Sequence, residues 1–349
     1  MKKIILFVIL LLPISIKASE SFIVMDADSL RVLGGKNINE ELLIASTTKL
    51  MTSLVALENS ETTDVLCAGE EILSVYGSMI YIDQNECMTL YDLLMGLNLR
   101  SGNDAALMIA DYVGKDVTDF VNKMNQKAKE IGMKNTTFHN PSGLDEEDEV
   151  GNYSTAYDMA ILTSYAMKNK EYRTIVGTKK YTLKTNKNHY IWYNKNKLLT
   201  NYKYTTGGKT GFTKKARRTL VSTASKDNLN LVVVTLNDGN DFQDHENLHE
   251  YGFSNYKEYR LLKKGIVKVK EEKYYQNDVL YIKNNIDYSL RDDEKQSVRL
   301  SFQFDKKKQL KNNRKVGEIH VKVGDEIVKK EPLYVKKKNV EKKGFFHFW

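Results

Sequence analysis

The sequence is poor in proline and cysteine, and it contains no repeat. Of its 349 residues, three are proline and two are cysteine. We find no low-complexity run and no internal repeat, which argues against a disordered or repetitive chain. With 41% apolar residues, the chain is long enough for two domains with cores of their own, because domains usually hold about 100 to 200 residues.

Neither cysteine lies in a pattern typical of metal binding or catalysis. Cys67 and Cys87 both lie near short stretches that resemble strands. In an exported protein they could form a disulfide, because oxidising compartments permit the bond. Two separate small core thiols are the alternative, and the sequence leaves both open.

The first 18 residues have the pattern of an export signal. An apolar run from Ile4 to Leu12 follows two lysines and precedes Pro13 and a short stretch that ends at Ala18. This pattern predicts a signal peptide over residues 1–18, cleaved after Ala18, and an exported, extracytoplasmic protein at the cell wall or the outer face of the membrane. A retained anchor is the alternative, but the run is short against the roughly 20 residues that span a bilayer.

The net charge of +8 is modest for this length and is concentrated in the last third of the chain. No sequence signature of a nucleic-acid-binding fold accompanies it, so we set a nucleic-acid partner aside. Residues 336–349 form a lysine block followed by four aromatic residues, and we expect this tail to contact the membrane peripherally. A frayed terminus is the alternative.

Apolar periodicity predicts an α+β domain over residues 19–262, in which an antiparallel sheet is flanked by helices. Its predicted strands are Phe22–Met25, Leu30–Leu33, Thr219–Ser225 and Leu229–Leu236. Its predicted helices begin at Ser46 and continue over Leu90–Leu99, Asp104–Tyr112, Val117–Ile131, Thr155–Met167 and His245–Tyr251. Short strands separated by charged turns then predict a small all-β domain over residues 263–335.

Three short motifs follow one another along the chain. They are Ser46-Thr47-Thr48-Lys49, Ser101-Gly102-Asn103 and Lys209-Thr210-Gly211. Residues three apart on a helix share a face, so Lys49 can reach the Ser46 hydroxyl. Serine is a weak nucleophile until a base takes its proton, and lysine can do so only where its pKa is lowered. Alone, this pair is better explained as an exposed helix start, but the three motifs together favour nucleophilic catalysis at Ser46.

The second motif interrupts two helical blocks, where a tight polar turn can direct its side chains into a cleft. The Ser101 hydroxyl can pass a proton to a leaving amine. The Asn103 amide can hold the substrate's peptide group and also bond Lys49.

The third motif lies at the opening of a strand. Lys209 and Thr210 offer a positive charge and a hydroxyl donor to a substrate carboxylate. Gly211 lets the ligand approach the backbone closely.

With these motifs the sequence resembles the low-molecular-mass penicillin-binding proteins that act as serine D-alanyl-D-alanine carboxypeptidases. The resemblance covers about residues 22–260 and implies a penicillin-binding, β-lactamase-like fold with a five-stranded sheet. It implies peptidoglycan stem peptides ending in D-Ala-D-Ala as substrates, β-lactam antibiotics as covalent inhibitors, and no cofactor or metal. The β module at the C-terminus resembles the accessory domain of these enzymes.

The resemblance also assigns roles to individual residues. Ser46 would be acylated, Lys49 would accept its proton, and Ser101 and Asn103 would complete the proton route. Lys209 and Thr210 would bind the terminal carboxylate, while the backbone N–H groups of Ser46 and Phe212 would form the oxyanion hole. Some family members carry an arginine after the strand that follows the lysine motif, but Asn237–Asp241 here is acidic and has none.

Other functions fit parts of the sequence. A DD-endopeptidase would use the same acylation. A β-lactamase would need a base for deacylation, for which Glu147 and Glu149 fall in the expected interval. A zinc protease could use His245, Glu246 and His249, which fit the pattern H-E-x-x-H in a polar, solvated helix. A non-catalytic wall-binding protein is a further alternative, against which the complete motifs argue.

Overall fold

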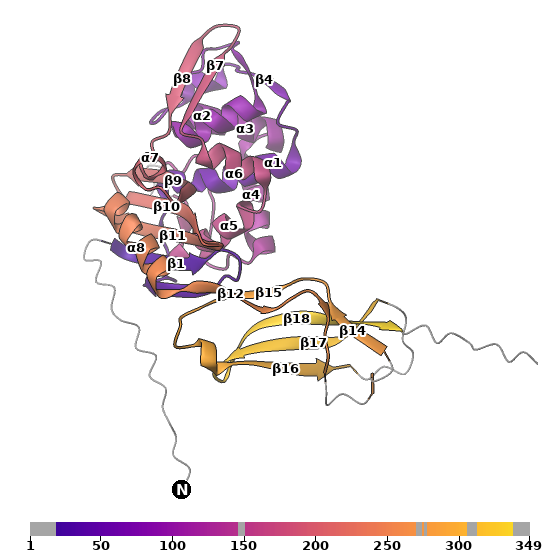
Figure 1. The fold of residues 1–349 in the computed structure, drawn as a ribbon. Helices are drawn as coiled ribbons and strands as arrows, with labels where there is room; N and C mark the ends of the chain where they lie inside the picture. Colours follow the sequence, from indigo (N-terminus) through magenta and orange to yellow (C-terminus); the bar gives the residue numbers. More distant parts are fainter. Residues whose placement is uncertain (1–18, 146–150, 270–273, 276–277, 306–312, 338–349) are drawn as a thin grey trace, which may run out of the picture. The chain divides into compact units, whose positions relative to one another are not determined.

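The computed structural model describes residues 19–145, 151–269, 274–275, 278–305 and 313–337. The predicted signal peptide, Glu147 and Glu149, and the tail beyond Lys337 lie outside the described residues. The chain divides into two compact units between Ser254 and Asn255 (Figure 1). Each unit is described by itself below.

The first unit is built on a five-stranded antiparallel sheet with the strand order β2-β1-β11-β10-β9. The strands are β1 (Ser19–Asp26), β2 (Val32–Lys36), β9 (Thr205–Thr213), β10 (Arg217–Lys226) and β11 (Leu229–Asp238). The first strand pairs with β11 from the far end of the unit, with Ile23 opposite Val234. The predicted α+β sheet is therefore confirmed, and the two ends of the unit meet at its centre.

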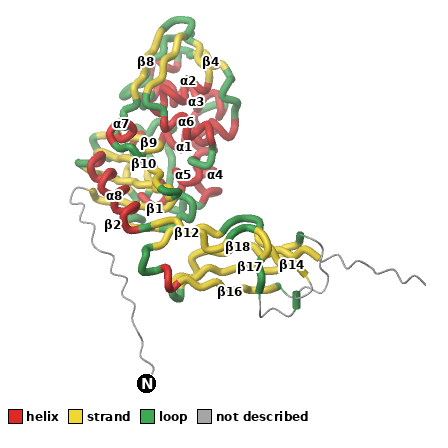
Figure 2. Tube along the Cα trace, in the orientation of Figure 1, coloured by secondary structure: helices red, strands yellow, loops and turns green. Residues whose placement is uncertain are grey.

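Both faces of the central strands are buried, which explains their continuous apolar runs. Helix α8 (Asp241–Asn255) covers one face, where a β-carbon on Gly252 would lie 2.5 Å from Leu231 Cδ1, so this leucine would have to shift to admit a side chain. The remaining helices form a cluster, part of which packs on the other face of the sheet (Figure 2). They are α1 (Lys49–Asn59), α2 (Leu90–Leu99), α3 (Asn103–Gly114), α4 (Val117–Ile131), α5 (Ala156–Ala166), α6 (Lys170–Gly177) and α7 (Leu198–Asn201).

One turn in this unit lies where the sequence predicts it, and another lies where the sequence predicts a strand. The β10–β11 hairpin turns at Asp227 and Asn228, both with positive φ, as its two-residue turn requires. The predicted strand Leu30–Leu33 is misplaced, because Leu30 has a φ of 61° and lies in the turn that the Asp26 side chain closes, so β2 begins at Val32.

The predicted helix at Ser46 begins with a single 3₁₀ turn, η1 (Ala45–Thr48), and continues as α1. Ser46 is not a capping residue. The N-cap of α1 is Thr48, and its side chain makes no capping hydrogen bond. The Ser46 hydroxyl is consequently free of the helix backbone and available for other contacts.

The first unit also contains small two-stranded sheets. They are β3 (Leu42–Leu43) with β6 (Tyr153–Ser154), β4 (Val65–Cys67) with β5 (Cys87–Thr89), and β7 (Lys180–Lys184) with β8 (His189–Tyr193); η2 (Glu71–Ser74) is a further 3₁₀ turn. Cys67 and Cys87 lie opposite each other on β4 and β5 and form a disulfide. The bond decides between the two alternatives that the sequence left open.

The described part of the second unit is built mainly of strands, as its sequence predicts. Its main sheet has the order β13-β14-β18-β17-β16, and β12 pairs with β15 in a second, two-stranded sheet. The elements are β12 (Lys257–Leu262), β13 (Gly265–Ile266), β14 (Asp278–Ile282), β15 (Ile286–Leu290), η3 (Lys295–Ser297), β16 (Val298–Phe304), β17 (Arg314–Val323) and β18 (Glu326–Lys337).

Two boundaries differ from those expected from the sequence. The sequence put the domain boundary at about residue 262, but β12 pairs with β15 and belongs to the second unit. Lys336 and Lys337, counted above as the start of the tail, are the last residues of β18 and pair with Val279 and Asp278. Among the described residues, no helix is long and apolar enough to span a membrane.

Candidate active site

The three motifs meet at the edge of the sheet in the first unit. A cavity of about 450 Å³ is lined by Ser46 from η1, Ser101 from the turn between α2 and α3, and Thr210, Gly211 and Phe212 from edge strand β9. Strand β9 lies directly against η1. A β-carbon on Gly211 would stand 3.1 Å from the backbone nitrogens of Ser46 and Thr47, which explains why this position is glycine.

Lys49 is the first residue of α1 and is completely buried. Its Nζ lies 3.1 Å from Ser46 Oγ, 2.7 Å from Asn103 Oδ1 and 2.5 Å from the Ser142 carbonyl oxygen. The helical spacing therefore brings the amine to the hydroxyl as the sequence predicts. Two further acceptors fix its position.

The electrostatics of Lys49 favour its neutral form. Burial lowers the pKa of Lys49 well below its ordinary value, and the positive charges of Lys209 and Lys195 lower it further, while Asp104 acts in the opposite direction. A neutral amine has two N–H donors, which suit the oxygens of Asn103 and Ser142. Its lone pair is then left for the Ser46 hydroxyl proton.

The loop that carries Ser142 is held rigidly against α1. Asn140 Oδ1 accepts hydrogen bonds from the backbone nitrogens of Ser142 and Gly143. Asn152 Nδ2 joins the loop to the helix by donating to Asn140 O and to Thr48 Oγ1. None of the three sequence motifs includes this segment, and they gave no sign that a carbonyl oxygen from it contacts Lys49.

The second motif forms a strained turn with its side chains turned inward. Ser101 is buried and has a φ of 67°, a conformation that is uncommon for a residue with a side chain. Asn103 donates from Nδ2 to the Tyr76 carbonyl oxygen, which leaves Oδ1 facing Lys49. The next residue, Asp104, accepts hydrogen bonds from the backbone nitrogens of residues 80–82. Hydrogen bonds of both Asn103 and Asp104 therefore hold the turn against the segment that contains residues 76–82.

Lys209 is 1% exposed and is not among the residues that line the cavity. Its Nζ donates to Ser101 Oγ at 3.1 Å and to the Thr210 carbonyl oxygen at 2.6 Å. Burial and the nearby charge of Lys195 lower its pKa to about 7. Lys209 thus joins the second motif to the third, while Thr210, half-buried, faces the cavity.

Other cations line the cavity, and the sequence did not predict them. Lys195 donates to Ser78 Oγ at 3.3 Å on the side of the α2–α3 turn. Arg218 lies on β10, and its Nη2 donates to Asp241 Oδ1 at 2.7 Å. No short motif marks either residue in the sequence, because each joins the site only through the packing of distant elements.

The two histidines of the H-E-x-x-H pattern lie on the buried side of α8, against the sheet. The Ser222 hydroxyl stands between them, 2.6 Å from His245 Nδ1 and 2.7 Å from His249 Nε2. Burial lowers the pKa of both imidazoles, that of His249 to about 3. The expectation of a solvated helix face was therefore wrong for these histidines. Within the described residues, no three His, Cys, Asp or Glu side chains are grouped so that they could hold a metal ion.

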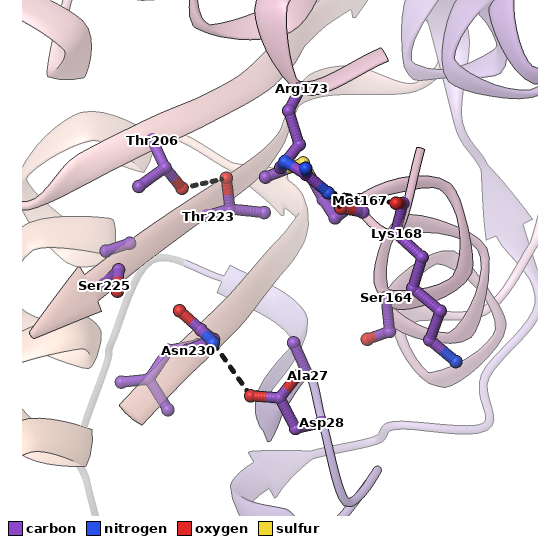
Figure 3. Close-up of a pocket in the computed structure, with 12 residues that line it drawn as sticks. Ala27, Asp28, Ser164, Met167, Lys168, Arg173, Thr206, Thr223, Ser225 and Asn230 are labelled. Atoms are coloured by element: carbon purple, nitrogen blue, oxygen red, sulfur yellow. Dashed lines mark hydrogen bonds between the residues drawn. The ribbon is translucent and has the colours of Figure 1, made fainter. Parts of the chain in front are cut away.

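A second cavity, of about 520 Å³, lies between the sheet and helices α5 and α6 (Figure 3). Its polar side chains bond one another: Asn230 Nδ2 donates to Asp28 Oδ2, and the hydroxyls of Thr206 and Thr223 are 2.7 Å apart. Arg173 donates to main-chain carbonyl oxygens at the end of α5. None of the predicted site residues lines this cavity.

The antiparallel sheet, the helical cluster and a serine bonded to a buried lysine define the class of penicillin-binding and β-lactamase-like serine enzymes. A family model for D-alanyl-D-alanine carboxypeptidases matches residues 13–240, and one for the C-terminal domain of penicillin-binding protein 5 matches residues 256–342. The chain belongs to the D-alanyl-D-alanine carboxypeptidase family, and it is a serine-type carboxypeptidase of the penicillin-binding class.

Individual relatives agree with this assignment. The chain is 35% identical to the D-alanyl-D-alanine carboxypeptidase DacF of Bacillus subtilis, with 73% of this chain and 68% of that one covered. It is 31% identical to DacA of Haemophilus influenzae, over 74% and 68% of the two chains. The solved structure of penicillin-binding protein 5 from Haemophilus influenzae matches with a TM-score of 0.79 at 25% identity, over 92% of this chain and 97% of that one. D-Ala-D-Ala peptides as substrates and penicillin binding follow from the family, whose members act outside the cytoplasm.

Proposed function

We propose that the enzyme removes the terminal D-alanine from peptidoglycan stem pentapeptides through an acyl-enzyme on Ser46. The observation that carries the proposal is the contact between Lys49 Nζ and Ser46 Oγ, at 3.1 Å, in surroundings that lower the pKa of the lysine. A base that is neutral at working pH and within hydrogen-bond reach is what a serine nucleophile needs.

In the acylation step, Lys49 accepts the Ser46 proton while Oγ attacks the carbonyl carbon of the penultimate D-alanine. The backbone N–H groups of Ser46 and Phe212 stabilise the oxyanion, and losing one such donor typically costs about 10²-fold or more in rate. The C–N bond then breaks, and Ser101 passes the proton to the departing amine, while Asn103 holds Lys49 and the substrate's peptide group. Water hydrolyses the ester and returns a proton to Ser46.

The third motif supports both binding and proton transfer. Thr210 faces the cavity and donates its hydroxyl to the substrate carboxylate. Lys209 is buried and bonded to Ser101, so it acts through that hydroxyl and through its charge. Gly211 keeps β9 close enough to η1 for both oxyanion donors to converge.

The same attack on a lactam carbonyl makes β-lactam antibiotics covalent inhibitors. Among the described residues that line the cavity, the one carboxylate is that of Asp241, which is paired with Arg218. Asp241 is therefore not a free carboxylate that could activate water against a penicilloyl ester. We expect a long-lived adduct, whereas rapid turnover of penicillin would favour the β-lactamase alternative.

The test is release of D-alanine from a pentapeptide, and from a cross-linked dimer to detect endopeptidase action, by purified wild-type and variant enzymes. Ser46→Ala should lower release by at least about 10³-fold and abolish labelling by penicillin. Ser74→Ala, on an exposed 3₁₀ turn, is the matched control and should leave both unchanged. Unchanged release by Ser46→Ala would refute the proposal.

We also infer that the mature enzyme works at the outer face of the cytoplasmic membrane, with the tail after β18 in contact with lipid. The signal-like first 18 residues, the disulfide and the basic aromatic sequence at the C-terminus support this location. Truncation after Lys337 keeps β18 whole and should move the protein from the membrane fraction to the soluble fraction. An unchanged distribution would contradict this inference.

A further inference from the structure

The substrate's carboxylate needs a cationic partner at the cavity wall, and Lys209 is not exposed there. Lys209 as a whole is 1% exposed, and its Nζ already donates to Ser101 Oγ and Thr210 O. Burial and the nearby charge of Lys195 also lower its pKa, to about 7. A carboxylate leaving water is best received by a charged donor that can bond it directly.

Arg218 stands on the same wall as Thr210. In the β9–β10 ladder Arg218 lies opposite Phe212, two residues beyond Thr210 on β9, and side chains two apart share a face of a sheet. Arg218, Thr210 and Ser46 all line the 450 Å³ cavity. The arginine is therefore on the side where a hydroxyl donor for the carboxylate already lies.

The Arg218 guanidinium bonds Asp241 through one of its nitrogens and has further N–H donors that can bind a ligand. Its Nη2 bonds Asp241 Oδ1 at 2.7 Å, and its carbon lies 5.4 Å from the centre of the Phe242 ring. Since a guanidinium has five N–H donors, this contact leaves others for a ligand. The arginine side chain is 43% exposed, while the Asp241 side chain is 4% exposed.

Asp241 is suited to orient this arginine. It is the first residue of α8, and its Oδ1 also accepts from the Phe242 backbone nitrogen at 2.9 Å. Burial raises the pKa of Asp241 above its ordinary value, and the hydrogen bond from Arg218 and its positive charge offset part of that rise. The acidic stretch 237–241 contains no arginine, but its Asp241 binds and orients Arg218 from β10.

The other lining cations are less suitable. Lys195 donates to Ser78 Oγ in the loop between η2 and β5, and burial together with the charge of Arg100 lowers its pKa. Lys197 is exposed and precedes the short helix α7. A lysine presents a point charge, whereas arginine can bind both oxygens of a carboxylate.

We propose that Arg218, oriented by Asp241, binds the carboxylate of the substrate's terminal residue beside Thr210. This inference rests on the proposed carboxypeptidase function. Arg218 acts by direct contact with the substrate, and Asp241 is a positioning residue. The arrangement makes a free terminal carboxylate a requirement for efficient cleavage.

The test compares two substrates that differ only at this group, a peptide ending in D-Ala-D-Ala and its C-terminal amide. Arg218→Gln should lower kcat/KM for the acid about 10- to 100-fold, the range expected for loss of a hydrogen bond to a charged group. It should leave kcat/KM for the amide nearly unchanged, so the preference for the acid collapses. Arg218→Lys should retain part of that preference.

Arg217→Gln is the matched control, because Arg217 is the neighbouring residue of β10, is exposed, and pairs with Thr213 outside the cavity lining. It should keep the wild-type ratio of acid to amide cleavage. Asp241→Asn should reduce the ratio of acid to amide cleavage less than Arg218→Gln does. In the double variant Arg218→Gln/Asp241→Asn, the second substitution should reduce this ratio little further. Thermal unfolding of each variant shows whether it folds.

Three results would overturn the role of Arg218: an unchanged acid preference in Arg218→Gln, an equal loss on acid and amide, or an equal effect of Arg217→Gln. Failure of the proposed function is separate, since it would show as activity of Ser46→Ala. In Arg218→Gln, labelling by penicillin should persist at a lower rate and still require Ser46. Labelling that survives in the double variant Ser46→Ala/Arg218→Gln would refute the acyl-enzyme rather than the carboxylate site.

Discussion

Gly211 offers a sharp test of how strand β9 positions the nucleophile. An alanine here would place its β-carbon 2.3 Å from Thr219 Oγ1 and 3.1 Å from the backbone nitrogens of Ser46 and Thr47. Ordinary contacts need about 3.5 Å or more. The Thr219 hydroxyl would have to move by about 1 Å, although it is buried and bonded to the Ile44 carbonyl oxygen at 3.1 Å.

The alternative to that movement is that β9 shifts away from η1. Overpacking of this kind costs about 1 to 3 kcal/mol of stability. A displacement of about 1 Å in a catalytic group can cost about 10² in rate. We therefore expect Gly211→Ala to unfold at lower denaturant concentration and to release D-alanine about 100-fold more slowly, with a comparable loss in the rate of penicillin acylation.

Two further variants make this result interpretable. Gly239→Ala is the control, because nothing lies within 4 Å of its added β-carbon, and it should behave as wild type. Adding Thr219→Ala to Gly211→Ala removes the closest contact and should recover stability, less about 1 kcal/mol for the lost hydrogen bond to Ile44. Wild-type activity in Gly211→Ala would refute the claim that β9 and η1 must touch closely for catalysis.

Three other predictions concern buried groups. Burial lowers the pKa of Lys209 to about 7, so between pH 7 and the ordinary lysine pKa the folded state binds fewer protons than the unfolded state. The free energy of unfolding should therefore rise by about 1 kcal/mol per pH unit in the lower part of that window. In denaturation measured at several pH values, Lys209→Met should flatten this rise. Replacing Cys67 and Cys87 by serine opens a link across 20 residues and should cost about 3 kcal/mol in the chain-entropy model, measured by denaturant unfolding, with reduction of the wild type as the parallel experiment. Ser222→Ala leaves two buried imidazoles without their shared hydroxyl and should cost about 1 to 3 kcal/mol, while chelators should leave D-alanine release unchanged; a chelator-sensitive enzyme would restore the zinc alternative.

Much of the first unit could be predicted because its signals are local. The runs around Ile23 and Val233 are apolar on both faces, as strands in the middle of a covered sheet must be. Helix α4 begins at Val117 and ends at Ile131 as expected, since Asp116 caps it and Gly132 closes it with a positive φ. The turn at Asp227 and Asn228 likewise follows from the residues themselves.

The rest depends on contacts between distant residues. Nothing near Ser142 in the sequence shows that its carbonyl oxygen meets Lys49, which lies 93 residues away. Arg218 and Asp241 are 23 residues apart on a strand and a helix, and no periodicity relates such positions. The sequence also did not predict that His245 and His249 are buried. Their neighbours in the sequence are polar, and these residues gave no sign that α8 packs on the sheet through its histidines.

The cluster of lysines around Ser46 leads to a last prediction, on the pH dependence of acylation. Lys209 and Lys195 both lower the pKa of Lys49, so removing either charge should raise that pKa and move the acid limb of the kcat/KM profile to higher pH. Lys209→Met should shift the limb more than Lys195→Met, because Lys209 makes the larger contribution. Lys209→Met also breaks the bond to Ser101 and lowers the maximum rate, but the position of the limb reports the Lys49 pKa separately from the height of the profile. A limb that stays in place in both variants would show that Lys49 is not the group whose deprotonation limits the reaction. In that case the short contact with Ser46 would be structural, and the base would have to be sought elsewhere.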